Sequence, residues 1–234
     1  MLSEQGLSSL NSRCDEIAAI LFERLASRKS DDILSKELKA LARKDTALAL
    51  DEEVVATLAP PNARALLRDI CTIYVDRFHM RFQPLTYACT SRILPAFLGA
   101  AFARRWNALR PLRSFDQTVS CHGASRELEA LHSAGTVVFA CAHSSNLDSL
   151  AIGLVLKRAG FPPCVYPAGK HLYRNRLAAH MVSRLGAYQL DRGLDAILYK
   201  EIVIEYSTLL IEEGFHSVIF PAAPEHATAQ LTAT

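Results

Sequence analysis

The sequence contains no apolar run long enough to cross a lipid bilayer. Its apolar stretch at 93–103 is interrupted by Pro95 and is much shorter than the ~20 residues that a spanning helix needs. Strong positive charge is missing as well, since the formal net charge is only +2 at pH 7, whereas nucleic-acid binding relies on many clustered cations. We therefore expect neither a transmembrane protein nor a nucleic-acid-binding protein.

Cysteines are few, and they do not stand in close pairs. The six occupy positions 14, 71, 89, 121, 141 and 164, which fits neither a disulfide scaffold nor a zinc site. No secretory signal opens the sequence, so we expect reduced thiols in a cytoplasmic protein. We also expect no metal centre, although Cys141 lies two residues before a histidine.

Half of the 234 residues are hydrophobic, which is enough for one sizeable core or for a core with a smaller accessory unit. In the first half of the chain, apolar residues recur with helical spacing. This pattern predicts three helices: one capped by Ser12, one over 31–42 and one after Pro60-Pro61. We predict an N-terminal helical accessory region at 1–115 and a second domain at 116–234.

From residue 115 onward, segments typical of strands alternate with segments typical of helices. The predicted order is strand 136–142, helix 147–159, strand 164–166, helix 172–185, strand 187–190, helix 194–213 and strand 216–220. This alternation predicts an α/β fold, a sheet flanked by helices. Functional residues are expected in the loops at the strand ends.

His143 and Asp148 stand five positions apart in the segment Cys-Ala-His-Ser-Ser-Asn-Leu-Asp at 141–148. A carboxylate at this spacing can hydrogen-bond one imidazole nitrogen and leave the other free to take a proton from a substrate hydroxyl. The pair is therefore a candidate general base with its orienting acid. The alternative is a structural role, with His143 at a helix N-terminus and Asp148 as a solvated acid in the first turn.

A second motif, Gly-Ala-Tyr-Gln-Leu-Asp-Arg at 186–192, follows further along the chain. Seen alone, Asp191-Arg192 is typical of a surface ion pair. In order and separation, however, the two motifs resemble the first two blocks of the glycerolipid acyltransferases, His-x-x-x-x-Asp and Gly-x-x-x-(Ile/Leu)-(Asp/Arg)-Arg. The segment 168–172 resembles that family's Ala-Lys-x-x-Leu stretch with one residue shifted, and 217–221 resembles the strand that leads into its third block.

The resemblance implies acyl transfer from a thioester to a glycerol hydroxyl on a glycerol-3-phosphate acyltransferase-like fold. In that reaction His143 is the base, Asp148 orients it, and Arg192 holds the acceptor phosphate, for which a planar guanidinium is suited. The donor is acyl-CoA or acyl carrier protein. The acceptor is glycerol 3-phosphate or a related glycerolipid of phospholipid biosynthesis, and neither a metal nor a cofactor is required.

The third block of that family, Phe-Pro-(Glu/Gly)-Gly-Thr-Arg, is only partly present. After Phe220-Pro221 the chain reads Ala-Ala-Pro-Glu-His-Ala-Thr-Ala at 222–229. One extra base before the codon of Ala222 lets these codons read Gly-Gly-Thr-Arg-Ala-Arg-Asn-Gly, which predicts a frameshift. We therefore expect a domain that is incomplete at its C-terminus and a truncated, inactive chain.

Two alternatives stay open: a non-catalytic lipid- or partner-binding remnant, and acyl transfer to a different alcohol, such as a lysolipid or an ornithine lipid. The segment 93–113 carries an apolar body followed by Arg104, Arg105 and Trp106. This composition suits either an anionic membrane surface or a buried core helix. We expect a cytoplasmic protein that is peripheral at the cytoplasmic face of a membrane.

Overall fold

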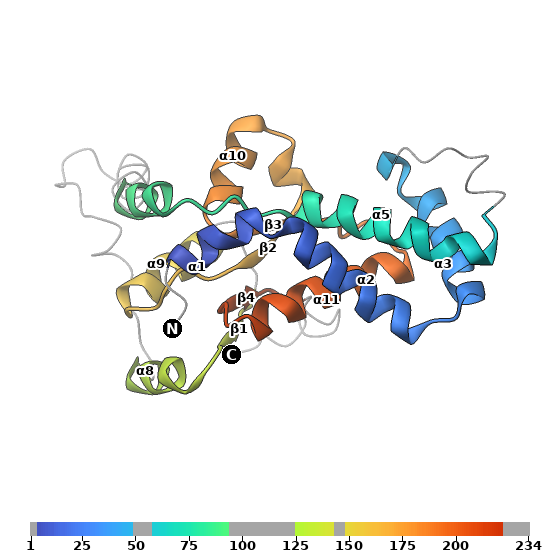
Figure 1. Ribbon diagram of the computed structural model, residues 1–234. Helices are drawn as coiled ribbons and strands as arrows, with labels where there is room; N and C mark the ends of the chain where they lie inside the picture. The colour runs from blue at the N-terminus through green and yellow to red at the C-terminus, as the bar shows by residue number, and fades with distance from the viewer. Residues whose placement is uncertain (1–3, 49–57, 94–124, 143–147, 222–234) are drawn as a thin grey trace, which may run out of the picture.

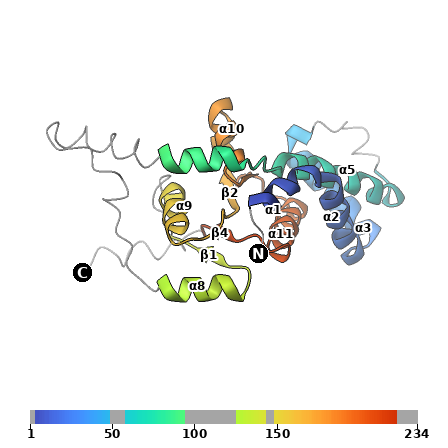
Figure 2. The same ribbon diagram turned by 60° about the vertical axis from the view of Figure 1, so that its left-hand side comes forward.

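The computed structural model of the protein describes residues 4–48, 58–93, 125–142 and 148–221 (Figure 1). Helices dominate this part of the chain, and its short strands all run parallel. Most helices of the first half lie together at one side of the molecule (Figures 1 and 2). The strands lie beside them and are formed by the second half of the chain.

The helices predicted for the N-terminal region are confirmed. The described α-helices up to residue 78 are α1 Glu4–Ser9, α2 Cys14–Arg28, α3 Asp31–Lys44 and α5 Pro60–Phe78. The predicted cap Ser12 is wrong, because Arg13 precedes α2 and Ser12 ends a short 3-10 helix. The Ser12 hydroxyl donates backwards to the carbonyl oxygen of Ser9 at 2.9 Å, so it does not serve the α2 N–H groups.

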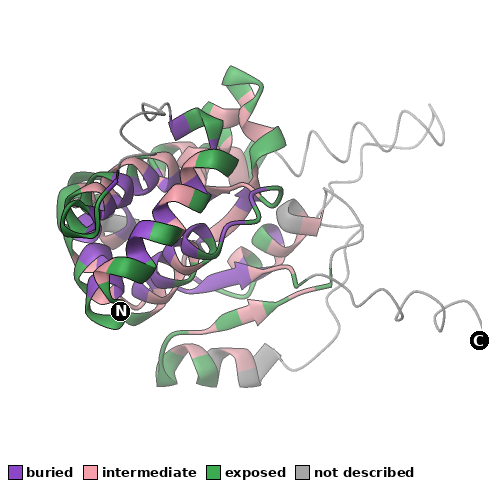
Figure 3. Ribbon diagram, turned by 90° about the vertical axis from the view of Figure 1, so that its right-hand side faces the viewer, coloured by how far each residue is buried: buried purple, intermediate pink, exposed green. Residues whose placement is uncertain are grey.

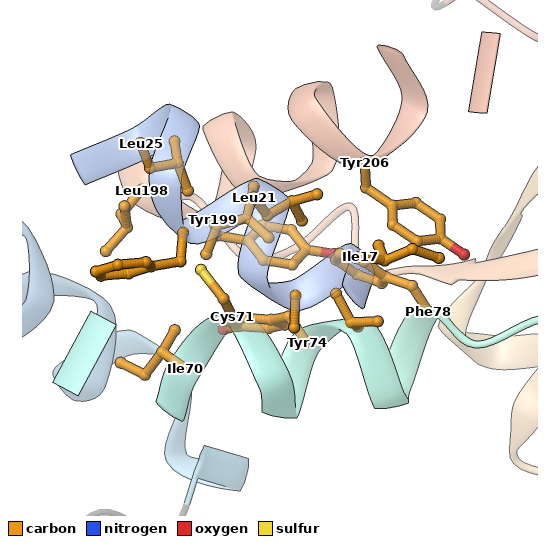
Figure 4. Packing of buried hydrophobic residues seen from close by; sticks show 14 of the residues in the cluster. Ile17, Leu21, Leu25, Ile70, Cys71, Tyr74, Phe78, Leu198, Tyr199 and Tyr206 are labelled. Carbon is orange, nitrogen blue, oxygen red and sulfur yellow. The ribbon is translucent and has the colours of Figure 1, made fainter. Parts of the chain in front are cut away.

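These helices bury their apolar faces against one another and against α11, Ile197–Glu212. Side chains from α2, α5 and α11 meet in this core (Figure 4), and buried residues gather where the helices pack (Figure 3). Leu21, Ile70 and Ile202 are completely buried, and burying a side chain of this kind stabilises a fold by about 1.5–3 kcal/mol. The main core therefore joins the first half of the chain to the second.

Charged side chains also join α2 to α11 at the edge of this core. The Glu205 side chain is only 7% exposed, and it pairs with Arg28 and, at 3.5 Å, with Arg24. Arg24 also reaches Glu212 at 2.6 Å. Because a buried carboxylate is costly unless it is paired, Glu205 depends on the guanidinium groups of α2.

The strands form two parallel pairs that one bridge connects. The bounds are β1 Val138–Ala140, β2 Tyr166–Gly169, β3 Ala187–Leu190 and β4 Ser217–Ile219. β1 pairs with β4, and β2 pairs with β3. Val165, just before β2, bridges to Ser217. The spatial order is therefore β1-β4-β2-β3.

Parallel strands need crossover connections, and helices supply them here. α8 (Ser125–Ala134) precedes β1, α9 (Asp148–Arg158) follows it, α10 (Arg176–Arg184) lies between β2 and β3, and α11 lies between β3 and β4.

The helix predicted over 172–185 begins later than expected, because Asn175 caps it. The Asn175 Oδ1 accepts the N–H groups of Leu177 and Ala178. The alternation of strands and helices is compatible with an α/β fold.

The predicted domain boundary at residue 115 lies outside the described residues, as does most of the segment 93–113. The division at that position stays a prediction. Within the described ranges, no helix is both long enough and apolar enough to cross a membrane. No group of three or more His, Cys, Asp and Glu side chains there is placed to hold a metal ion.

A histidine pair supports the start of the β1–β4 pairing. The Nε2 of His216 lies 2.9 Å from the Nδ1 of His132 on α8, and the Nδ1 of His216 accepts the N–H of Val137 at 2.9 Å. His216 is buried and packs against the Phe161 ring. Burial, together with the neighbouring His132, lowers the pKa of His216 below its ordinary value of 6.5.

The free energy of unfolding is expected to fall as the pH drops from about 7 to about 5. In this range the His216 imidazole binds a proton more readily in the unfolded chain than in the folded one, because its pKa is lower in the folded state. The contribution is fully present above the unfolded pKa of 6.5 and is lost below it. Urea unfolding across this pH range measures it. His216→Asn keeps an acceptor for the Val137 N–H and should flatten the profile, whereas His180→Asn, at an exposed position on α10, should leave it unchanged. An equal slope in wild type and His216→Asn would contradict this.

Candidate active site

The carboxyl ends of the parallel strands share one edge, which is where α/β proteins place ligands. Ala140 at the end of β1 stands beside Ile219 at the end of β4, and Gly169 at the end of β2 stands beside Leu190 at the end of β3. Asp191 and Arg192 of the second motif follow the end of β3, and the first motif follows β1 in the sequence. The fold therefore gathers segments that are distant in sequence.

A cavity of about 440 Å³ opens at this edge. Its walls come from the end of β2 with the 3-10 helix Lys170–Tyr173, from the turn after β3, and from the residue after β4. Its lining includes Tyr166, Lys170, His171, Arg174, Arg192 and Phe220. The cavity is thus rich in cations on the side formed by the loops.

Arg192, the predicted phosphate-binding residue, lies in the exposed turn after β3 and lines this cavity. Its neighbour Asp191 pairs with Lys170 instead, with 2.8 Å between Lys170 Nζ and Asp191 Oδ2. The ammonium group lowers the pKa of the Asp191 carboxyl, which stays ionised. Within the described residues Arg192 has no ion-pair partner, so its guanidinium is available to a ligand.

The turn that carries Arg192 is held in place by hydrogen bonds on both sides. The N–H of Asp191 donates to the hydroxyl of Tyr199 on α11 at 2.8 Å. The Asp191 Oδ1 accepts the N–H of Gly193 at 3.1 Å, which closes a tight turn around Arg192. The packing of α11 therefore helps to fix the backbone of the turn that carries Arg192.

Gly186 opens the second motif for a steric reason. Its φ is +94°, and a Cβ at this position would come within 3.0 Å of the carbonyl oxygen of Cys164. Its own carbonyl oxygen accepts the N–H of Tyr166 at 3.1 Å, which begins the β2–β3 pairing. A side chain here would both strain the backbone and push β3 away from β2.

His143 lies outside the described residues, so its geometry relative to Asp148 stays a prediction. The chain on either side is described. The N–H of Cys141 donates to the Ile219 carbonyl oxygen at 2.9 Å, which holds the end of β1 at the carboxyl edge. Asp148 is half-buried and is the first residue of α9, as the motif predicts. It is not among the described lining residues of the cavity.

A second, mainly apolar pocket of about 80 Å³ adjoins the first one. Tyr166 and Phe220 line both, so these two rings stand between the cationic cavity and the apolar pocket. Leu154, Leu185 and Val218 are among the apolar residues that line the second pocket. Burial raises the pKa of Tyr166 to about 12, so its hydroxyl stays protonated near neutral pH.

Sequence reasoning assigned no role to Lys170, His171 or Arg174, which line the cavity with Arg192. A signal was present, because the segment 168–172 resembles a family stretch that contains lysine. Arg174 belongs to no recognised motif, and its position in the cavity wall depends on the path of the chain between β2 and α10. The arrangement suits a ligand that joins an anionic group to an apolar group.

Comparison with known families agrees with this chemistry. Residues 122–231 match the family model described as Acyltransferase. The matched region contains the described strands, the cavity walls contributed by the loops after β2 and β3, and both predicted motifs. The match supports assignment of this region to an acyltransferase family, whose substrates are an acyl donor and an acceptor. No curated protein matches the chain.

Proposed function

We propose that the intact form of this domain transfers a fatty acyl group from acyl-CoA or acyl carrier protein to a hydroxyl of glycerol 3-phosphate or a related glycerolipid acceptor, and that this chain is an inactive form of it because the third block is lost after Pro221. The observation that carries the proposal is Arg192, which has no ion-pair partner among the described residues, lies inside the region matched by the acyltransferase model and lines a cavity that adjoins an apolar pocket. The cationic cavity suits the acceptor phosphate, and the apolar pocket suits the first carbons of the acyl chain.

The proposed reaction consists of two proton transfers and one acyl substitution. His143 takes the proton of the acceptor hydroxyl, and the oxygen attacks the thioester carbonyl carbon. The carbon–sulfur bond then breaks, and the leaving thiolate takes the proton from the His143 imidazolium, which restores the neutral base. Asp148 keeps the imidazole in the productive tautomer, and Arg192 holds the acceptor phosphate so that the hydroxyl meets the carbonyl.

This function makes the protein a peripheral enzyme of phospholipid biosynthesis at the cytoplasmic face of a membrane. A direct test uses the chain in which residues 222–229 are replaced by Gly-Gly-Thr-Arg-Ala-Arg-Asn-Gly, incubates it with palmitoyl-CoA and follows release of free thiol with and without glycerol 3-phosphate. Mass spectrometry then identifies the acylated product. Thiol release that depends on the phosphorylated acceptor supports the proposal. Release that is equally fast with glycerol or with no acceptor overturns it.

The non-catalytic remnant is a second candidate, and the departure from the third block after Pro221 favours it. The two candidates separate when residues 222–229 are replaced by Gly-Gly-Thr-Arg-Ala-Arg-Asn-Gly. If the natural chain binds glycerol 3-phosphate without turnover and the replacement gains turnover, the catalytic site is intact and only the third block is lost. Binding without turnover in both proteins would establish the remnant. Turnover with a lysolipid but not with glycerol 3-phosphate would reassign the acceptor.

A further inference from the structure

Helix α10 exposes large apolar side chains that no other part of the described structure covers. Leu177 is 77% exposed and Met181 is 44% exposed. The two residues are four positions apart, so they lie on the same face of the helix. Leaving two such side chains in water gives up the free energy that their burial would release.

The protein holds α10 at its C-terminal end. The carbonyl oxygens of Ser183 and Arg184 accept the N–H groups of Arg81 and Gln83, both at 3.1 Å. In both views α10 stands out from the strands (Figures 1 and 2). The face that carries Leu177 is therefore presented at a protruding part of the molecule.

The segment that contains α10 carries positive charge only. Residues 170–184 contain Lys170, Arg174, Arg176 and Arg184 and no Asp or Glu. Lys170 is paired with Asp191, but Arg174 and Arg176 are exposed beside Leu177. An apolar face flanked by exposed arginines is the combination that anionic lipid surfaces attract.

We propose that the α10 surface, defined as Arg174, Arg176, Leu177, His180 and Met181, docks onto a bilayer that contains anionic lipid. Leu177 and Met181 enter the boundary between head groups and acyl chains, and the arginines contact lipid phosphates. A bilayer fits better than an acidic protein because a protruding apolar tip can enter a flat, soft surface without a matching pocket.

Docking in this orientation brings the candidate active site to the lipid. Lys170, His171 and Arg174 line the cavity, and the same stretch of chain leads directly into α10. The bilayer is thus a partner of the proposed acyltransferase, and lipid binding is measured in an experiment that does not require acyl transfer. Loss of lipid binding and loss of acyl transfer are therefore separate results.

The test is flotation of the full chain with vesicles of phosphatidylcholine alone and with phosphatidylglycerol added. The wild-type chain should float with the anionic vesicles, and added salt should weaken the binding. The double variant Leu177→Asp/Met181→Asp should lower the bound fraction about tenfold or more. Arg176→Gln should reduce the preference for phosphatidylglycerol over phosphatidylcholine.

Ile197→Asp/Ile204→Asp is the matched control, because these α11 side chains are 65% and 59% exposed and lie outside the α10 surface. It should float like wild type, and circular dichroism should show that both double variants are folded. Failure of the wild-type chain to float overturns the proposal. Flotation of the α10 double variant at the wild-type level would also overturn it, because lipid binding would then lie elsewhere. An equal loss of flotation in both double variants would overturn it as well. Binding to acyl carrier protein but not to vesicles, lost in the α10 variant, would assign the surface to an acidic protein instead.

Discussion

Replacing His143 by alanine is expected to slow acyl transfer by about 10²- to 10⁴-fold, the usual contribution of a positioned general base. Without the imidazole, the acceptor hydroxyl must lose its proton to water while it attacks the thioester. The described ends of β1 and β4 place the residues just before His143 at the carboxyl edge where the cavity opens. The loss should therefore fall on kcat more than on the KM for the acceptor.

The measurement is acceptor-dependent thiol release from palmitoyl-CoA across a range of pH. The reference is the version that carries the replaced residues 222–229, because the natural chain is expected to be inactive, and His143→Ala is made in that version. The reference should show an ionisation on the acidic side of its profile that His143→Ala lacks, a result that a purely structural histidine would not give. Ser144→Ala and Ser145→Ala are neighbouring controls and should keep activity within a few-fold. An unchanged rate in His143→Ala would remove this residue from the mechanism.

Replacing Arg192 by methionine is expected to weaken binding of the acceptor by about 10- to 100-fold, because hydrogen bonds to a charged group contribute roughly 1.5–3 kcal/mol. The side chain lines the cavity without an ion-pair partner among the described residues, whereas Lys170 is already paired with Asp191. Arg192 and Arg174 are therefore the lining guanidinium groups that have no acidic partner among the described residues, and only Arg192 belongs to a predicted motif. Arg192→Lys should recover part of the affinity, since an ammonium group keeps the charge but lacks the planar fork.

Steady-state kinetics with glycerol 3-phosphate and with glycerol separate this role from a structural one. In Arg192→Met the KM for glycerol 3-phosphate should rise, and turnover of glycerol should stay as slow as in wild type. Arg43→Met serves as the control for loss of one positive charge, because Arg43 is exposed on α3 and does not line the cavity. If the control raises the KM as much as Arg192→Met does, the effect is general electrostatics and not phosphate binding.

The local features of the fold could be predicted from the sequence because they depend on local spacing. Apolar periodicity located α2, α3 and α5, and runs rich in β-branched and aromatic residues located β1 and β4. The strand predicted at 164–166 shares only Tyr166 with β2, which extends to Gly169. Errors arose where a single side chain decides a boundary. Asn175 delays the start of α10, and Ser12 turns its hydroxyl back to Ser9.

Contacts between distant segments could not be predicted in the same way. The motif at 186–192 indicated Arg192, but the partner of Asp191 depends on β2 and β3 lying side by side. Likewise, Arg174 carries no pattern of its own and reaches the cavity because the short helix after β2 turns it there. Such pairs depend on register, which neighbouring residues do not encode.

The pairing of Glu205 with Arg24 and Arg28 limits how this protein can diverge. An exchange of α2 for a helix that lacks both arginines would leave the largely buried Glu205 carboxylate at the edge of the core without these partners, and breaking a buried pair typically costs about 3–5 kcal/mol. That is a large part of the whole stability of an ordinary domain. The opening segment and α11 are therefore expected to evolve as a single inherited unit, and recombination between them should be rare.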